Sequence, residues 1–179
     1  DTGYFGLLGS VRVEEDGPFP MDTCSGFSME ATVEIAHVLD PAFPDRCRLF
    51  VECNGHLISH AGVHPTFWRA GQSGVADPLE SLDEDCRSAM DCLGKKRLPV
   101  LGCGSARGGP DEVGGLTWLD WNSEFEDDER MPPQIVGHTP HSLGPRQNGR
   151  SWCIDGNQSC WAILNGDGSL EIRYLQGRS

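Results

Sequence analysis

The sequence is short of basic residues and has no long apolar run. Its 179 residues include 14 Lys and Arg against 27 Asp and Glu, which gives a formal net charge of −13. Such a surplus of negative charge repels nucleic-acid phosphates and anionic lipids. No window approaches the roughly 18 consecutive apolar residues of a membrane-spanning helix. We therefore expect neither a nucleic-acid nor a membrane partner.

The sequence also lacks the features of a targeting segment and of a cysteine-rich zinc site. The N-terminus has neither the basic nor the apolar region of a signal peptide, and its first residue, Asp1, suggests a chain processed or cut from something longer. The eight cysteines contain no Cys-x-x-Cys pair. These observations favour a cytoplasmic protein with reduced cysteines, while the even count leaves a disulfide framework in an oxidising compartment open.

Glycine and proline are abundant, with 23 and 12 residues respectively, so loops should make up much of the chain. No internal repeat divides the sequence, and we predict a single domain over residues 1–179. Glycine is densest in the segment at about 94–115. That segment lacks the Lys-Ser or Lys-Thr ending of a phosphate-binding P-loop, so the sequence favours a flexible linker inside the domain.

Apolar periodicity and turn signals predict an α/β chain. Apolar residues recur at helical spacing over two segments and alternate or run together over several others. Asn54-Gly55 is a strong two-residue hairpin signal between two expected strands, and the last three strands are expected to form an antiparallel meander. The predicted helices cover 28–39 and 79–93, and the predicted strands and apolar runs cover 47–53, 56–60, 134–138, 151–155, 160–165 and 169–175.

Histidine is the residue type that points to chemistry. Five of the six histidines gather in the segments 56–64 and 138–141. His60 and His138 each end an apolar strand beside a glycine, and the carboxyl edge of a sheet is where α/β folds place ligands. Two imidazoles bind a divalent ion poorly without carboxylates, so ordinary strand-end histidines remain an alternative at this point.

A longer pattern adds to the histidines. His60-Ala61-Gly62 follows an apolar strand, and the chain then presents Trp118 with Asp120, the segment 135–140 (Ile-Val-Gly-His-Thr-Pro) and the segment 154–156 (Ile-Asp-Gly). This order resembles the C-terminal half of the calcineurin-like metallophosphatases, in the branch of phosphoprotein phosphatases and symmetrical bis-nucleoside tetraphosphate hydrolases. The resemblance covers about residues 28–175. It implies half of an α-β-β-α sandwich, with a mixed sheet and both predicted helices on one outer face.

The resemblance also implies a metal site and its reaction. In that family the matching histidines bind the second metal of a binuclear centre of Mn, Fe or Zn, which corresponds to His60 and His138. The family's Gly-Asp-x-His-Gly, Gly-Asp-x-x-Asp-Arg-Gly and Gly-Asn-His-Glu segments are absent. We therefore expect part of a phosphoester hydrolase, completed by a missing N-terminal half or a second subunit and acting on phosphoprotein or dinucleoside polyphosphate. The alternative is a non-catalytic scaffold or interaction subunit of a larger assembly.

Other residues are candidates for supporting roles around the two histidines. Side chains of this kind orient a metal ligand or contact a substrate phosphate. The competing interpretation is that they are solvent-exposed strand ends and hairpin charges. These second-shell or substrate candidates are His64, His141, Asp155, Arg146 and Arg150.

Overall fold

The computed structural model describes residues 47–69, 76–92 and 98–175. Its centre is a mixed five-stranded sheet with the order β1-β2-β3-β5-β4. Strands β2, β3 and β5 run parallel, while β1 and β4 pair antiparallel at the two edges. The fold class is therefore α/β, as predicted. The strands of this sheet are β1 (Phe50–Cys53), β2 (His56–Ser59), β3 (Gln134–Val136), β4 (Arg146–Asn148) and β5 (Ser151–Cys153).

One α-helix, α3 (Pro78–Asp91), is present in the described part of the chain. Asp77 caps it by accepting a hydrogen bond from the Leu79 N–H at 2.9 Å, and Pro78 supplies a fixed φ at its first position. Leu82, Cys86 and Ala89 form its buried stripe. The helix predicted at 79–93 is confirmed within two residues at each end, whereas the one predicted at 28–39 lies outside the described residues.

The β1–β2 hairpin forms as Asn54-Gly55 predicts. Both turn residues have positive φ, +47° and +75°, which the tight two-residue turn requires. Beyond the turn, Leu57 and Ile58 of β2 pair with Gln134 and Ile135 of β3 in parallel register. Because parallel strands end at the same edge, the segments that follow β2 and β3 meet there.

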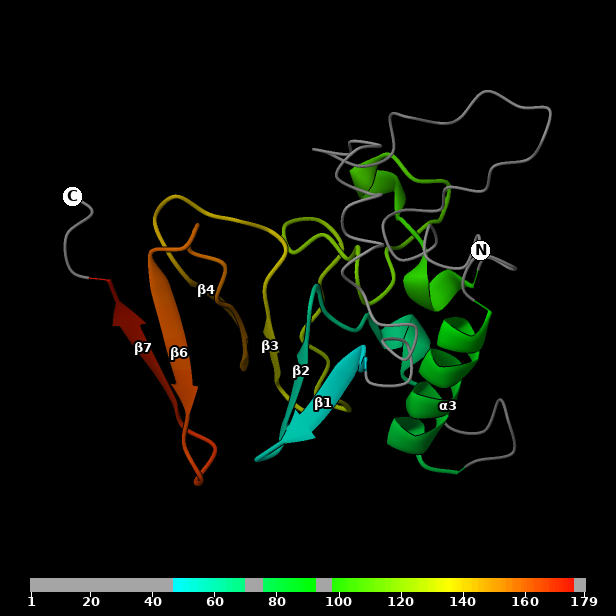
Figure 1. Ribbon diagram of the computed structural model, residues 1–179, viewed down its shortest axis with the longest axis horizontal. Helices are drawn as coiled ribbons and strands as arrows, with labels where there is room; N and C mark the ends of the chain where they lie inside the picture. Colours follow the sequence, from blue (N-terminus) through cyan, green and yellow to red (C-terminus); the bar gives the residue numbers. More distant parts are fainter. Residues whose placement is uncertain (1–46, 70–75, 93–97, 176–179) are drawn as a thin grey trace, which may run out of the picture.

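The predicted three-stranded meander is wrong in its pairing. Strand β5 pairs with β3 and β4, and only β6 (Cys160–Leu164) and β7 (Leu170–Tyr174) pair with each other, as a separate two-stranded sheet. Asn157 and Gln158 turn the chain between β5 and β6 with positive φ values of 53° and 62°. The alternation of apolar residues predicted the strands but carries no information about their partners. Figure 1 shows β6 and β7 at one end of the molecule and α3 at the other.

The described part of the glycine-rich segment, residues 98–115, is packed structure rather than a linker. It contains two short 3₁₀ helices, η4 (Pro99–Leu101) and η5 (Ser105–Arg107), and a bridge between Gly104 and Asp111. A Cβ on Gly109 would lie 1.9 Å from the Cys103 carbonyl oxygen, and one on Gly115 would lie 2.3 Å from that of Val100. The glycines are therefore needed for close backbone approach, which a pattern of composition alone does not distinguish from flexibility.

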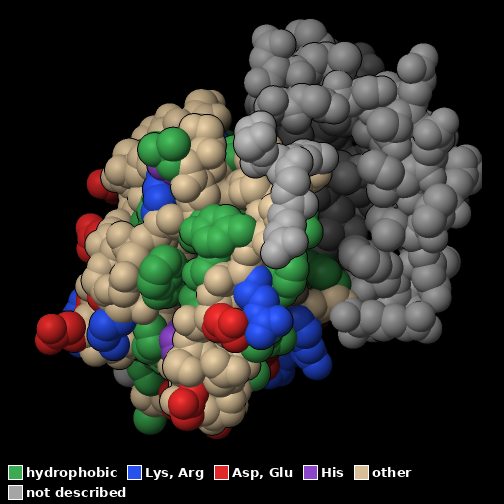
Figure 2. All heavy atoms as spheres, turned by 90° about the vertical axis from the view of Figure 1, so that its left-hand side faces the viewer, with side chains coloured by type: hydrophobic (Ala, Val, Ile, Leu, Met, Phe, Trp, Pro, Cys, Tyr) green, Lys and Arg blue, Asp and Glu red, His purple; other side chains and the backbone are tan. Residues whose placement is uncertain are grey.

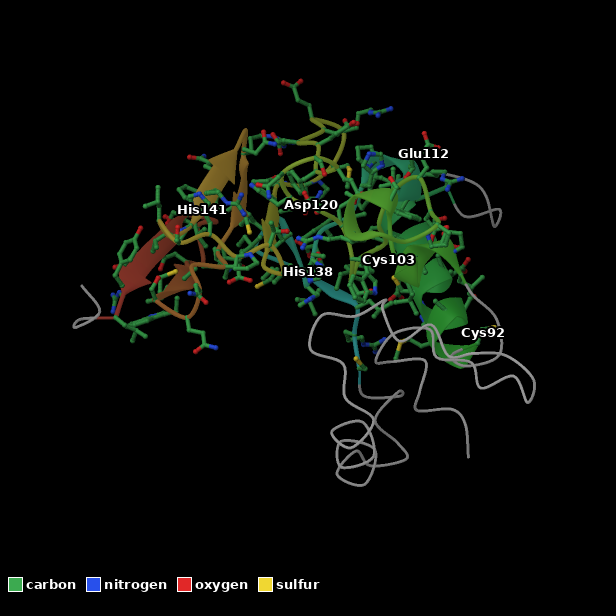
Figure 3. All side chains as sticks on the ribbon, turned by 90° about the horizontal axis from the view of Figure 1, so that it is seen from above. Cys92, Cys103, Glu112, Asp120, His138 and His141 are labelled. Carbon is green, nitrogen blue, oxygen red and sulfur yellow. The ribbon has the colours of Figure 1, made fainter. Side chains whose placement is uncertain are left out.

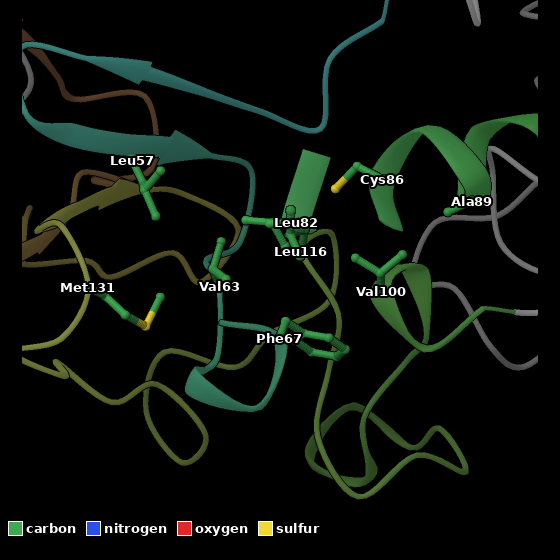
Figure 4. Close-up of a cluster of buried hydrophobic side chains, with 9 residues drawn as sticks. All are labelled: Leu57, Val63, Phe67, Leu82, Cys86, Ala89, Val100, Leu116 and Met131. Atoms are coloured by element: carbon green, nitrogen blue, oxygen red, sulfur yellow. The ribbon is translucent and has the colours of Figure 1, made fainter. Parts of the chain in front are cut away.

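Two apolar clusters hold the described part of the chain together. The first, here called the helix-side core, joins α3 to β2 and to the glycine-rich segment (Figure 4). The second, the site-side core, lies under the loops that follow β2 and β3. The helix-side core contains Leu57, Val63, Phe67, Leu82, Cys86, Ala89, Val100, Leu116 and Met131. The site-side core contains Ala61, Leu119, Trp121, Phe125, Val136 and Cys153.

Candidate functional site

His60 and His138 meet at the shared edge of β2 and β3. The Gly137 N–H donates to the His60 carbonyl at 2.8 Å, which extends the pairing of the two strands. The imidazoles then face each other, with His60 Nε2 and His138 Nδ1 2.9 Å apart and ring centroids separated by 4.8 Å. The two histidines that sequence spacing singled out are therefore in direct contact.

Both imidazoles favour the neutral form. Burial, together with the nearby His60 and Arg107, lowers the pKa of His138 to about 4. Partial burial also lowers the pKa of His60, and the Asp155 carboxylate opposes that change. Two neutral rings in contact share one proton between the facing nitrogens. Near neutral pH a divalent cation can therefore take the place of that proton and accept a lone pair from each of the two facing nitrogens.

Two carboxylates and an indole surround the pair. Asp155 acts electrostatically on both histidines, and Asp120 acts on His138. Trp118 lies edge-on to the His138 ring at a centroid distance of 5.6 Å. Figure 3 shows His138 and Asp120 close together between the strands and the helix. The site thus combines nitrogen donors, negative charge and an aromatic wall.

Arg107 is a site residue that the sequence analysis missed. The packed glycine-rich segment carries it to the histidines, where its Nη2 lies 2.8 Å from Asp120 Oδ2 and 2.7 Å from Thr139 Oγ1. Its Nε is buried without a hydrogen-bond partner. A signal existed in the sequence, an arginine within a run of glycines, but the segment was predicted to be a linker. The structure places a fixed positive charge beside His138.

Three of the predicted supporting residues lie on neighbouring loops. His141 donates its backbone N–H to the Asp155 carbonyl at 3.0 Å, and its Nδ1 is buried without a partner. This contact ties the loop after His138 to the loop that carries Asp155. His64 instead caps η3 (Pro65–Phe67), where its Nδ1 accepts from the Thr66 N–H at 3.2 Å. The His64 imidazole therefore serves the local turn.

The two predicted arginines are engaged by different parts of the protein. Arg146 donates from Nη2 to the Thr139 carbonyl at 2.6 Å and from Nη1 to Asn122 Oδ1. Arg150 donates to the carbonyls of Asp128 and Met131 at 2.8 and 3.1 Å. Arg146 thus contacts the loop that carries His138, whereas the contacts of Arg150 lie at 127–131.

The histidine pair fits one half of a metal shell. Two nitrogen ligands of a tetrahedral ion lie about 3.3 Å apart, so the pair would open by less than about 0.5 Å to hold one. Over residues 47–69, 76–92 and 98–175, no group of three or more His, Cys, Asp or Glu side chains is arranged to hold a metal ion. The remaining ligands would have to come from elsewhere.

Comparisons with known proteins assign no family to this chain. No protein-family model, curated protein or solved structure matches the chain. Within the described residues, no helix is long and apolar enough to cross a membrane. The seven cysteines in that part of the chain are free thiols.

Proposed function

We propose that this chain supplies one half of the metal centre of a phosphoester hydrolase. The observation that carries the proposal is the contact between His60 and His138, whose facing nitrogens are 2.9 Å apart and whose pKa values are both lowered. Neutral imidazoles are the protonation state that binds Mn, Fe or Zn. A divalent ion held by this pair would act as a Lewis acid on a phosphoryl oxygen.

The chain's other residues have distinct tasks in this proposal. Arg107 offers positive charge to the phosphoryl oxygens, and Asp120 with Thr139 holds its guanidinium in place. Positive charge matters here because the chain carries a net charge of −13, which repels anionic substrates at long range. Trp118 packs edge-on against His138 and shields that side of its ring. The resemblance supports phosphoprotein or dinucleoside polyphosphate as the substrate.

The proposal requires a partner that brings the missing ligands. In this proposal a missing N-terminal half or a second subunit would also complete an α-β-β-α sandwich, in which the described sheet would form one layer. Large apolar side chains remain exposed at the β6–β7 end, where Trp161 is 45% and Tyr174 is 59% accessible. Figure 2 shows hydrophobic side chains gathered on this face. An exposed apolar surface of this kind supports a protein partner.

The compartment belongs to the same proposal. The seven free thiols of the described residues suit a reducing environment, so we assign the chain to the cytoplasm. Burial raises the pKa of Cys86 to about 12, which keeps that thiol protonated and unreactive. The two buried cysteines, Cys86 and Cys153, are therefore proposed to act as small core residues.

A non-catalytic scaffold is the second candidate function. The described residues favour it in one respect, since they hold two histidines but no third ligand in place. Under that alternative the two imidazoles are strand-end side chains that satisfy each other by one hydrogen bond. The two candidates differ in metal content, because a scaffold has no need of an ion.

Metal loading of matched variants separates these two functions. The wild-type chain, His60→Ala, His138→Ala and the double variant are dialysed against Mn²⁺ or Zn²⁺ and analysed for bound metal. Because each single replacement leaves the same position incomplete, each should lose the ion, and the double variant should add little. His56→Ala, at the hairpin end of β2 and away from the site, is the control and should keep the metal. Because this chain supplies only two of the ligands, the metal is used in large excess, and wild-type loading below about a tenth of an equivalent under that excess would favour the scaffold.

A further inference from the structure

His138 lies in an unusual backbone conformation. Its φ is +66°, in the left-handed region that side chains other than glycine rarely adopt. The Thr139 N–H donates to the Gly137 carbonyl at 2.8 Å, two residues back. A bond of this span around a residue of positive φ defines the rare and strained form of the γ-turn. Such a conformation persists only where the surrounding structure imposes it.

The side chains of Arg146 and Cys153 contact the backbone on both sides of His138. Arg146 Nη2 donates to the Thr139 carbonyl at 2.6 Å and lies 3.9 Å from Cys153 Sγ. The Cys153 thiol, which is fully buried, lies 3.5 Å from the Gly137 carbonyl oxygen and 3.6 Å from that of Thr139. The carbonyls on both sides of His138 therefore have fixed partners. A charged donor at short distance is the stronger of the two, and the thiol is a weak one.

We propose that Arg146 and Cys153 are positioning residues that hold His138 in its γ-turn and thereby direct its imidazole at His60. In a relaxed turn the backbone of residue 138 would return to negative φ, and its side chain would leave the direction of His60. Arg146 is therefore not expected to contact a substrate phosphate, although the sequence made it a candidate for that role. Its Nη1 is also engaged by Asn122, and its Nε is buried without a partner.

The reason for positioning His138 in this way rests on the proposed function, since a metal ligand must point at its ion. The positioning itself requires no metal. A test of ring contact in the presence of a chelator therefore examines the positioning, and metal loading examines the function. The two can fail separately.

The experiment compares Arg146→Met with Arg150→Met on the same hairpin. Both arginines donate to backbone carbonyls, but only Arg146 contacts the turn at His138. The measurement is the nuclear Overhauser effect between the His60 and His138 rings in the metal-free chain. Loss of a charge-assisted hydrogen bond should favour the relaxed turn by roughly tenfold, so the signal should fall severalfold in Arg146→Met. It should be retained in Arg150→Met and partly recovered in Arg146→Lys.

Wild-type ring contact in a folded Arg146→Met variant would overturn the proposal. If that variant does not fold, Asn122→Ala and Cys153→Ala replace it, because each removes one partner of Arg146 and leaves its guanidinium in place. Both should weaken the ring contact in chains whose remaining amide spectrum is unchanged. Full ring contact in these two variants would equally overturn the proposal.

Discussion

The five-stranded sheet and the β6–β7 hairpin are built on different principles. Every residue of β3 is buried and α3 covers an apolar cluster beside β2, whereas no residue of β6 or β7 is fully buried. The turn of the β1–β2 hairpin contacts the turn of the β6–β7 hairpin through the Asn54 side-chain amide, which donates to the Asn165 carbonyl at 3.0 Å. The site lies in the part of the molecule that has cores on both sides. The strained backbone of His138 persists because well-packed residues surround it, and the β6–β7 hairpin has no such packing.

The largest contrast should appear when a leucine is truncated in each region. Leu57 of β2 is fully buried, and Leu164 of β6 is half-buried. Leu57→Ala should lower the free energy of unfolding by about 3–5 kcal/mol, since it removes contacts and leaves a cavity. Leu164→Ala should cost about 1 kcal/mol or less, because less apolar area is lost. Urea unfolding of both variants measures the difference, and equal costs would remove the distinction between the regions.

Glycine replacement sharpens the same contrast at backbone level. A Cβ at Gly109 would overlap the Cys103 carbonyl, whereas a Cβ at Gly166 in the β6–β7 turn meets nothing within 4 Å. Gly109→Ala should destabilise the chain by about 2–3 kcal/mol, and Gly166→Ala should change stability by less than about 0.5 kcal/mol. Thermal unfolding of the pair provides the measurement. A tolerated Gly109→Ala would show that the glycine-rich segment is a linker after all.

The smallest of the three effects is a dependence on pH that belongs to the histidine site. The pKa of His138 is about 4 in the folded chain, against about 6.5 when unfolded. Between these pH values the unfolded state binds more protons than the folded state. The contribution of His138 to the free energy of unfolding is therefore fully present above pH 6.5 and is lost as the pH falls toward 4. The loss should not exceed about 2 kcal/mol, because the ring is half-buried and solvent screens it.

The control for this effect removes the titrating groups themselves. His60, Arg107, Asp120 and Asp155 are the charged or titratable groups that act on His138, so the double replacement of His60 and His138 by Ala should flatten the profile. Urea unfolding with a chelator present, at several pH values between 4 and 7, provides the data. An unchanged slope in the double variant would assign the pH dependence to other groups.

Local signals allowed part of the fold to be predicted from the sequence. Asn54-Gly55 predicts the β1–β2 hairpin because only a few residue pairs adopt its turn, and the spacing of apolar residues predicts α3. The positions of His60 and His138 followed from the strands that precede them. Each of these features is decided by residues close together in the sequence.

Other features depended on contacts between distant residues and were missed. Strand β5 pairs with β3 and β4 instead of β6, and no pattern within 151–175 specifies that pairing. The role of Arg107 required the glycine-rich segment to fold against Asp120 and Thr139. The contact of Arg146 with the Thr139 carbonyl depends on the hairpin that carries it. Composition described these segments, but packing determined what they do.

One titration tests the central claim, that His60 and His138 form a single ligand site. Zn²⁺ is added to the chain labelled with ¹⁵N at its histidine rings, and the ring signals are followed. The account predicts that the signals of His60 and His138 change together with one midpoint, while those of His56 and His64 do not change. Signals of His60 and His138 that stay unchanged, or that respond with separate midpoints, would contradict it.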